Sequence, residues 1–343
     1  MGLKYPADVA AWQRWQNRQH WLRQAVHGTF YRGTPASTAC WVSVRNEEAP
    51  SALIVLESAA ASSRLSLLEP LQHLDGVPTA VVTPYDPTPW LPSGWVATAC
   101  PDFEPATQFP AARTILSASH YLGLGAAAWA HAQARGHTYA TMQHGLLTPF
   151  APPLPHGSAL LAWTRDDAEF WCSGRTDIEV SVVGSALLWE VAQRPQVHAS
   201  RFATPLFLGQ LHAAELPRAG LIRATTESCW QTGAHYRPHP SEKDIASRLQ
   251  HRVWQRLGVT VDDAVVPLSE LTTPVVSVFS TGILEAAARG LPAWAYYPGA
   301  PAWLGEFWER YGMSRWGSAP TPAPPTPDAE PARAVAAWIK EHA

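Results

Sequence analysis

The stretch "PVVSVFSTGILEAAARGLPAWAYYP", residues 274–298, decides the class of fold. Its first six residues form an almost continuous apolar run, which is typical of a strand buried on both faces. A helix-forming run follows at 281–290, and a second apolar run resumes at 292–298. A strand, a helix and another strand in this order predict one unit of a parallel α/β sheet.

The same alternation extends over most of the chain. It pauses near residues 190–204 and then restarts, with further strands expected at "LFLG", "AHYRP" and "AVVPL" and a helix at 241–257. We therefore predict an α/β fold of two Rossmann-like domains that face each other across a cleft. The predicted domains are residues 1–190 and 200–318.

A proline-rich tether and a last helix occupy residues 319–343. The tether is long enough to cross back over the molecule. Val335, Trp338 and Ile339 form an apolar stripe on the helix, which must be buried somewhere. We expect this helix to return to the N-terminal domain.

Composition limits the possible functions. The chain has 343 residues with 46% hydrophobic and 15% charged side chains, so it has enough apolar surface for a large core. A net charge of -3 does not favour nucleic acid as a partner. The four cysteines form no CxxC pair, which argues against a zinc ribbon or dithiol chemistry. With no signal-type segment and no long apolar run, we expect a cytoplasmic protein.

The N-terminal segment, residues 8–27, has helical spacing of apolar residues with arginines between them. Two interpretations are open: a basic helix lying on an anionic membrane, or a helix docked on its own domain. The apolar positions are Val9, Trp12, Trp15, Leu22 and Val26, and the basic ones are Arg14, Arg18 and Arg23.

Polar groups follow consecutive strands of the second half, where open α/β sheets bind ligands. "YRPHPSEK" at 236–243 places Arg237, His239 and Pro240 before the predicted helix, which we expect to start near Pro240 or Ser241. Free N–H groups at a helix start attract anions, so this is a predicted phosphate site, although His239 could equally serve a local structural role.

The strand at 274–279 is followed by a second candidate for phosphate binding. Ser280, Thr281 and Gly282 lie at the start of a predicted helix, and Glu285 lies one turn later, where a carboxylate suits a ribose diol. Gln210, after "LFLG", would face the same rim.

The N-terminal half contributes a histidine at a strand end. In "QHG", Gln143, His144 and Gly145 follow the strand "YATM"; Gly145 would allow a tight turn, and His144 would point into the cleft. A histidine suits a general base, because its pKa is close to neutrality. Gly184 and Ser185 either approach a ligand or simply begin a helix.

These motifs resemble bacterial glycosyltransferases of the GT-B fold. The resemblance is to the superfamily of capsule and wall polymer enzymes, which includes capsular polysialyltransferases, Kdo transferases and CDP-glycerol glycerophosphotransferases. It rests on "QHG" at 143–145, "AWTRDDAEFW" followed by "VVGS", "RPHP" at 237–240 and "STGILEAAARGLP" at 280–292.

The resemblance implies roles for several residues. His239, Ser280 and Thr281 would contact the donor phosphate. His144 would be the base, as proposed for the glycerophosphotransferases; in polysialyltransferases an N-terminal acid has that role, and Glu57 is the best-placed candidate here. The N-terminal domain would then be the acceptor side and the C-terminal domain the donor side.

The function that follows is transfer from a nucleotide-activated sugar, CMP-linked or NDP-linked, to a saccharide or lipid-linked acceptor in surface polysaccharide assembly. No metal or other cofactor is expected, since neither "DD" at 166–167 nor that at 262–263 is a persuasive metal motif. Three alternatives remain open: a CDP-polyol phosphotransferase, a nucleotide-sugar 2-epimerase, and an inactive binding module.

Overall fold

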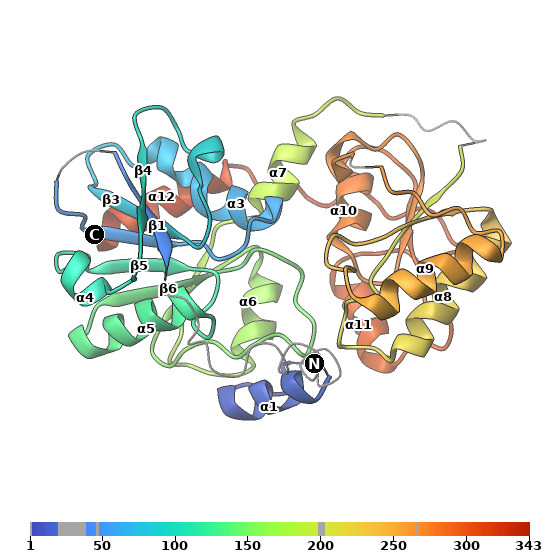
Figure 1. Cartoon of the computed structure of the whole chain (residues 1–343), viewed down its shortest axis with the longest axis horizontal. Helices are drawn as coiled ribbons and strands as arrows, with labels where there is room; N and C mark the ends of the chain where they lie inside the picture. Colours follow the sequence, from blue (N-terminus) through green and yellow to red (C-terminus); the bar gives the residue numbers. More distant parts are fainter. Residues whose placement is uncertain (1, 20–38, 46–47, 198–202, 265) are drawn as a thin grey trace.

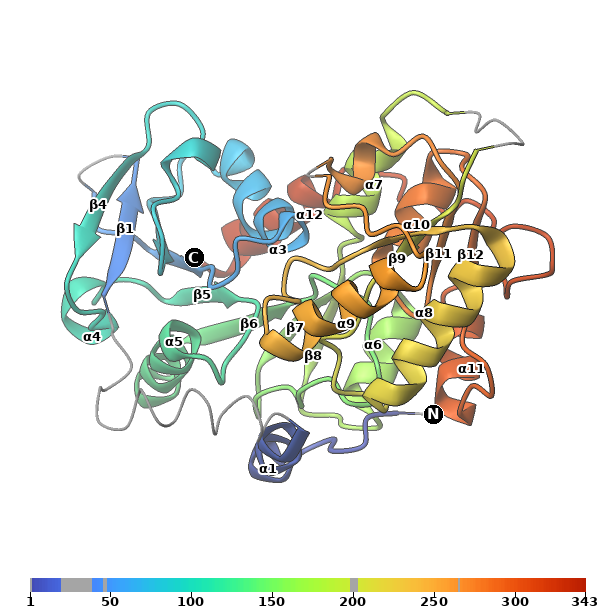
Figure 2. The ribbon, with the colours of Figure 1, turned by 45° about the vertical axis from the view of Figure 1, so that its right-hand side comes forward.

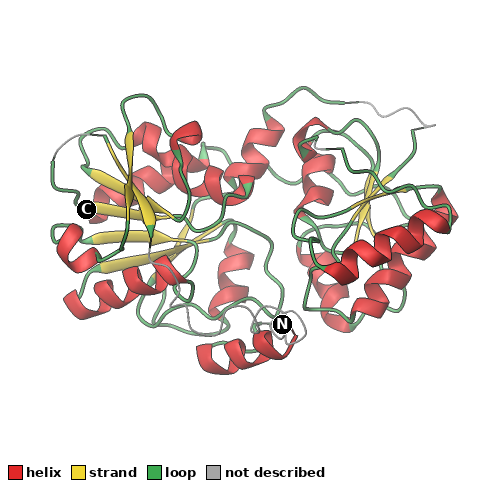
Figure 3. Ribbon diagram, in the orientation of Figure 1, coloured by secondary structure: helices red, strands yellow, loops and turns green. Residues whose placement is uncertain are grey.

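A computed structural model describes residues 2–19, 39–45, 48–197, 203–264 and 266–343. Figure 1 shows two α/β domains side by side, one built from the first half of the chain and one from the second half. Each contains one sheet with helices packed around it (Figure 3). The predicted fold class, an α/β protein with two Rossmann-like domains, is confirmed.

The N-terminal domain holds an eight-stranded sheet in the order β4-β1-β3-β2-β5-β6-β7-β8. Strands β3, β2, β5, β6, β7 and β8 pair in parallel, whereas β1 runs in the opposite direction and pairs antiparallel with both β3 and the edge strand β4. The strands are β1 (Cys40–Val44), β2 (Ala52–Val55), β3 (Thr79–Thr83), β4 (Val96–Cys100), β5 (Thr114–Ser117), β6 (Thr138–Met142), β7 (Ala159–Ala162) and β8 (Glu179–Val182).

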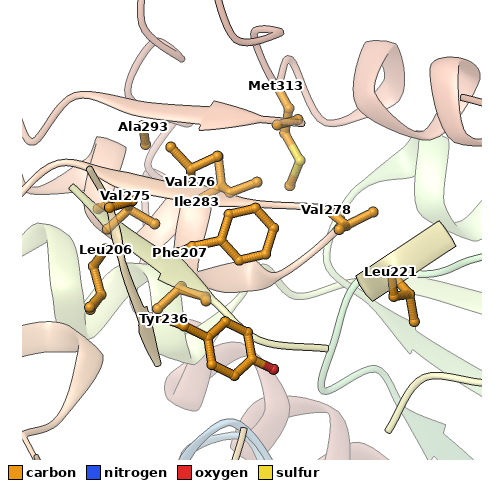
Figure 4. Close-up of a cluster of buried hydrophobic side chains, with 14 of the residues drawn as sticks. Leu206, Phe207, Leu221, Tyr236, Val275, Val276, Val278, Ile283, Ala293 and Met313 are labelled. Atoms are coloured by element: carbon orange, nitrogen blue, oxygen red, sulfur yellow. The ribbon is translucent and has the colours of Figure 1, made fainter. Parts of the chain in front are cut away.

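The C-terminal domain holds a four-stranded, fully parallel sheet in the order β10-β9-β11-β12. Its core packs Phe207, Tyr236 and Val276 between the strands and the surrounding helices (Figure 4). The strands are β9 (Leu206–Leu208), β10 (His235–Arg237), β11 (Val275–Ser277) and β12 (Ala293–Ala295).

The helices are distributed over both domains. Those of the first are α1 (Val9–Gln19), α3 (Ala61–Leu68), α4 (Pro105–Gln108), α5 (Gly123–Arg135), α6 (Arg165–Cys172) and α7 (Ala186–Ala192), with 3₁₀ turns η1 (Glu69–His73) and η2 (Thr88–Trp90). Those of the second are α8 (Arg218–Thr232), α9 (Ile245–Arg256), α10 (Thr281–Ala288) and α11 (Ala302–Arg310), with η3 (Leu268–Glu270). The last helix is α12 (Pro331–His342).

The chain crosses between the domains twice. Helix α7 contacts both α3 of the first domain and α10 of the second. Helix α12 lies against the N-terminal sheet, where Val335, Trp338 and Ile339 pack with Ile54 and Leu116. Burial of this apolar stripe fixes the end of the chain on the first domain.

One sequence-based expectation was wrong. The segment "AVVPL" supplies no named strand in its described part: Leu268 begins η3 instead, and the added pairing in this region is a single bridge from Tyr236 to Val261. For the N-terminal segment, the docked alternative is the one observed: Trp12 is buried and donates to the Phe150 carbonyl at 2.7 Å, while Trp15 stacks on the Phe150 ring. Residues 20–27 of the expected helix lie outside the described residues.

Within the described ranges, no helix is both long and apolar enough to cross a bilayer.

Candidate functional site at the carboxyl ends of the strands

The loops that follow β9 and β11 are tied together by Gln210. Its side-chain Oε1 accepts hydrogen bonds from the Phe279 N–H at 2.9 Å and from the Ser277 hydroxyl at 3.2 Å. Gln210 therefore lies at the predicted rim, but its acceptor atom is committed to bracing the exit of β11. This brace fixes the position of Ser280, the next residue after Phe279.

The loops that follow β9 and β10 are tied together by Glu242. This buried carboxylate accepts hydrogen bonds from the Tyr236 hydroxyl at 2.6 Å and the Leu211 N–H at 2.9 Å, and it lies 3.0 Å from His251 Nε2. Burial alone would raise the pKa of Glu242, but the His212 ring 4.0 Å away and the hydrogen bonds with His251 and Tyr236 lower it to about 2. Glu242 is therefore ionised and acts as a fixed anion beneath the rim.

The ring of His239 is stacked on the ring of His212. The sequence did not identify His212 as a site residue. The two ring centroids are 3.9 Å apart and the planes differ by 19°. Loss of hydration, followed by repulsion from His212, lowers the pKa of His239 to about 4, so the ring is neutral at pH 7. His212 could have been found, since it follows β9 by four residues, at the same edge of the sheet.

The hydrogen bonding of His239 fixes its tautomer. The Ser241 N–H donates to His239 Nδ1 at 3.1 Å, so the proton of the neutral ring must be on Nε2. The residue is exposed overall, although His212 covers one face of its ring. It therefore offers an uncharged Nε2–H donor to a ligand at the rim.

Helix α9 starts later than predicted. Asp244 is its N-cap and accepts from the Ser247 N–H at 2.9 Å, whereas Pro240 and Ser241 belong to an exposed turn before the helix. The predicted contribution of this helix start to anion binding at His239 is therefore wrong. Several residues between 239 and 244 can cap a helix, and a carboxylate is as strong a cap as a hydroxyl.

The start of α10 agrees with the predicted position. Ser280 is the N-cap, and its hydroxyl accepts from the Gly282 N–H at 3.1 Å. A Cβ at Gly282 would lie 2.4 Å from Leu208 Cδ1, so a larger residue there would have to displace this leucine side chain. Thr281 is the first helical residue and remains half-buried, so its N–H and hydroxyl lie where helix ends attract anions.

Glu285 lies one turn along α10 and is buried. Burial raises its pKa to about 7, while the Thr281 hydroxyl lowers it and Glu190 on α7 raises it further. Because α7 packs on α10, Glu285 faces the junction of the two domains. Binding of a ribose diol by Glu285 stays a prediction, and it would require α7 and α10 to move apart.

Arg237 does not join the His239 group. Its guanidinium donates to the Val266 carbonyl, and its side chain lines a separate hollow of about 410 Å³ with Asp262 and Glu270. Side chains alternate across a strand, so Arg237 leaves β10 on the face opposite to Tyr236. The sequence alone did not reveal this alternation because the strand is only three residues long.

In the N-terminal domain, His144 follows β6 and is half-buried. Its Nδ1 lies 3.4 Å from the Met142 carbonyl, and a proton on Nδ1 would leave the Nε2 lone pair free. Burial lowers the pKa of His144, which keeps the ring neutral near pH 7. This is the protonation state that a general base requires.

The neighbours of His144 have different roles. Gln143 is fully buried, accepts from the Trp163 N–H at 2.8 Å and donates to Asp167 at 2.8 Å, so it holds the loop rather than contacting a ligand. Gly145 lies in a bend, as predicted, but it has no positive φ, so the bend does not require a glycine at this position. No described atom lies within 4 Å of the position of a Cβ at Gly145, so the loop is open there.

Glu57 follows β2 at the same sheet edge as His144. It accepts hydrogen bonds from the Ser119 hydroxyl at 2.7 Å and from the Leu124 N–H at 2.9 Å, and it thereby caps α5. Burial raises its pKa in spite of these bonds. One strand, β5, separates β2 from β6, so the two residues follow strands that lie roughly 10 Å apart.

Gly184 and Ser185 serve the fold. Ser185 caps α7 by accepting from the Leu188 N–H at 3.3 Å. Gly184 has φ +84°, and a Cβ there would be 2.8 Å from Pro327 of the tether. Of the two alternatives, the structure therefore shows the second: Gly184 and Ser185 begin a helix.

The two domains meet directly beside the loop of His144. The Tyr311 hydroxyl, after α11, donates to Asp167 of α6 at 2.6 Å and accepts from the Leu147 N–H at 2.8 Å. Arg310 donates to the Leu147 carbonyl and lies over the Phe170 ring. A cavity of about 350 Å³ opens between α6 and α11; its lining includes Asp166, Glu169, Trp303 and Glu306.

Comparisons with known proteins give distant structural similarity alone. No family model matches the chain, and no curated protein matches it. The pneumococcal O-GlcNAc transferase GtfA, solved with UDP and GlcNAc, is similar over 66% of this chain at 12% identity and a TM-score of 0.36. The chain spans about half of that protein, since the match covers 49% of it.

The glycotransferase of kitacinnamycin is similar over 85% of this chain and 90% of its own, at 16% identity and a TM-score of 0.42. Similarity at this level gives no information about activity.

Proposed function

We propose that the protein is a glycosyltransferase that uses a nucleotide-activated sugar. The observation that carries the proposal is the joining of three strand ends in the C-terminal domain. Gln210 and Glu242 brace the loops after β9, β10 and β11, so that the uncharged donor of His239 and the capped start of α10 lie at one rim. Donors held in fixed positions at a helix start suit a phosphate.

The reaction would be displacement at the anomeric carbon of the donor sugar. The acceptor oxygen forms the new bond to that carbon while the bond to the phosphate oxygen breaks, and the nucleotide leaves with its negative charge. His239, Thr281 and the start of α10 would stabilise this charge. We propose that these groups suffice without a metal ion.

The acceptor must lose a proton as it attacks. His144 is our choice of base, because a proton on Nδ1, toward the Met142 carbonyl, would leave its Nε2 lone pair free and because burial favours its neutral form. Glu57 is less suitable, because each of its oxygens already accepts a hydrogen bond, one from the Ser119 hydroxyl and one from the Leu124 N–H at the start of α5. The proton of the acceptor hydroxyl would pass to His144 Nε2.

The biological setting follows from the sequence resemblance. We propose a role in surface polysaccharide or glycoconjugate assembly, in the cytoplasm, with a saccharide or lipid-linked acceptor. Transfer of a polyol phosphate from a CDP-linked donor would use the same rim and is distinguished by its products.

A thermal unfolding panel with CMP, CDP, UDP and GDP tests the proposal. A nucleotide at about a hundred times its dissociation constant stabilises the folded state by about 2.7 kcal/mol. We expect such a shift with at least one nucleotide, followed by sugar release from its conjugates. No shift with any of the four would refute a nucleotide-dependent transferase.

A further inference from the structure

Helix α9 presents its apolar side chains to solvent. Ile245, Leu249, Val253 and Leu257 recur every four residues and are 69%, 60%, 38% and 53% exposed. Four exposed large apolar residues in one row on a helix of about 18 Å are unusual for a surface that meets only water. Figure 2 shows α9 beside α8 at the front of the C-terminal domain.

The inner face of α9 is held by polar contacts. Ser247 accepts from the Arg218 guanidinium at 2.9 Å, His251 lies 3.0 Å from Glu242, and the Trp254 indole donates to Thr226 of α8 at 2.8 Å. These bonds fix the rotation of the helix about its axis. The apolar row therefore cannot turn inward without breaking contacts of buried groups.

Basic side chains accompany the apolar row. Arg248, Arg252 and Arg256 are exposed, and each follows a member of the row by three residues, so each lies beside it on the helix surface. No acidic residue occurs between Ile245 and Leu257. The chain as a whole has a net charge of -3, so this face departs from the average surface.

An exposed tryptophan extends the surface onto the neighbouring helix. Trp230 is 60% exposed and lies one turn after Thr226, the residue of α8 that bonds Trp254 of α9. Tryptophan side chains favour the boundary between headgroups and acyl chains.

We propose that the α9 surface, formed by Ile245, Leu249, Val253, Leu257, the three arginines and Trp230, binds an anionic lipid bilayer. Such a bilayer buries the apolar row and places negative headgroups beside the arginines. A second copy of the same surface would bring arginines opposite arginines, which disfavours self-association. The membrane contact is thus assigned to α9 and not to α1, because the tryptophans of α1 pack against Phe150 of their own domain.

Cosedimentation with vesicles tests the assignment. The full-length protein is mixed with phosphatidylcholine vesicles that contain phosphatidylglycerol, and with phosphatidylcholine alone. We expect binding to the anionic vesicles that weakens as salt rises. The double variant Leu249→Glu/Val253→Glu should lose it, and Arg248→Ala, Arg252→Ala and Arg256→Ala should each weaken it by roughly fivefold.

Matched variants make the result specific. Val96→Glu/Val182→Glu changes two exposed valines of the N-terminal domain, and Arg14→Ala/Arg18→Ala removes two exposed arginines of α1; both should bind as the unmodified protein does. Light scattering and circular dichroism establish the mass and folding of every variant.

Three results would overturn the proposal: no binding by the unmodified protein, unchanged binding by the folded Leu249→Glu/Val253→Glu protein, or a dimer that this variant converts to a monomer. The last result would mean that a second copy covers the surface. None of these outcomes depends on the transferase activity.

Discussion

The Tyr311 hydroxyl donates a 2.6 Å hydrogen bond to Asp167 and so joins the two domains beside the loop of His144. Asp167 is buried, which raises its pKa, and the same carboxylate is bonded by Gln143 of that loop. The domain contact and the position of the candidate base therefore share one carboxylate. A change in domain orientation would be felt directly by the loop.

We expect Tyr311→Phe to loosen the domain contact. The variant leaves one oxygen of the buried Asp167 without its donor, which should lower the free energy of unfolding by about 1–3 kcal/mol. Tyr296→Phe is the control, because the Tyr296 hydroxyl also donates to a carboxylate, that of Glu227, but within one domain. Small-angle scattering should show a more extended molecule for Tyr311→Phe alone. Identical curves for the two variants would show that the Tyr311–Asp167 hydrogen bond does not hold the domains together.

We expect His144→Ala to separate chemistry from binding. A general base typically supplies a hundred- to ten-thousandfold, so turnover should fall by about that factor while nucleotide affinity is retained. His144→Gln should lose as much, since an amide cannot accept the proton. If His144→Ala keeps most of its turnover, the base is Glu57 or another acid of the N-terminal domain.

The same base predicts the pH dependence of the reaction. Burial lowers the pKa of His144 from its ordinary 6.5, so the neutral, base-competent ring persists to lower pH than in a free histidine. The acid limb of the kcat profile should therefore lie below pH 6.5. A limb above that value would mean that His144 is not the titrating group.

Glu285 predicts a pH dependence of stability. The pKa of Glu285 is 4.5 in the unfolded chain and about 7 in the folded chain. Between these pH values the folded state therefore binds one more proton than the unfolded state. Stability from this group is therefore lost as pH rises through this range. Glu285→Gln should stabilise the protein above pH 7, by up to about 3 kcal/mol, and have no effect below pH 4.5.

Urea unfolding at several pH values measures this difference. Glu309→Gln is the matched control, because Glu309 is exposed on α11. A pH-independent effect of Glu285→Gln would show that its carboxyl is ionised in the folded state.

The local sequence pattern was sufficient to predict the two α/β domains and the positions of some of the site residues. Continuous apolar runs mark buried parallel strands, so the residues that follow them, His239 and Ser280 among them, could be located without coordinates. The start of α9 was misplaced by several residues, because Asp244 and Ser241 are both good caps and only packing chooses between them.

Contacts between distant parts of the chain could not be predicted from local patterns of apolar or capping residues. Tyr311 and Asp167 are 144 residues apart, and nothing in either segment indicates the other. The stacking of His212 on His239 depends on the lengths of two loops, and the direction of Arg237 depends on the register of a three-residue strand. These features follow from tertiary packing.

Nucleotide binding by the His239→Ala variant shows whether the rim of the C-terminal domain is the phosphate site. Calorimetric titration would use the nucleotide that stabilises the unmodified protein, with His156→Ala as control, since His156 is exposed in the other domain. We expect the folded His239→Ala protein to lose affinity roughly ten- to a hundredfold, as for one hydrogen bond to a charged group, and the control to lose none. Equal affinities for the unmodified and His239→Ala proteins would contradict the assignment of the rim as the phosphate site.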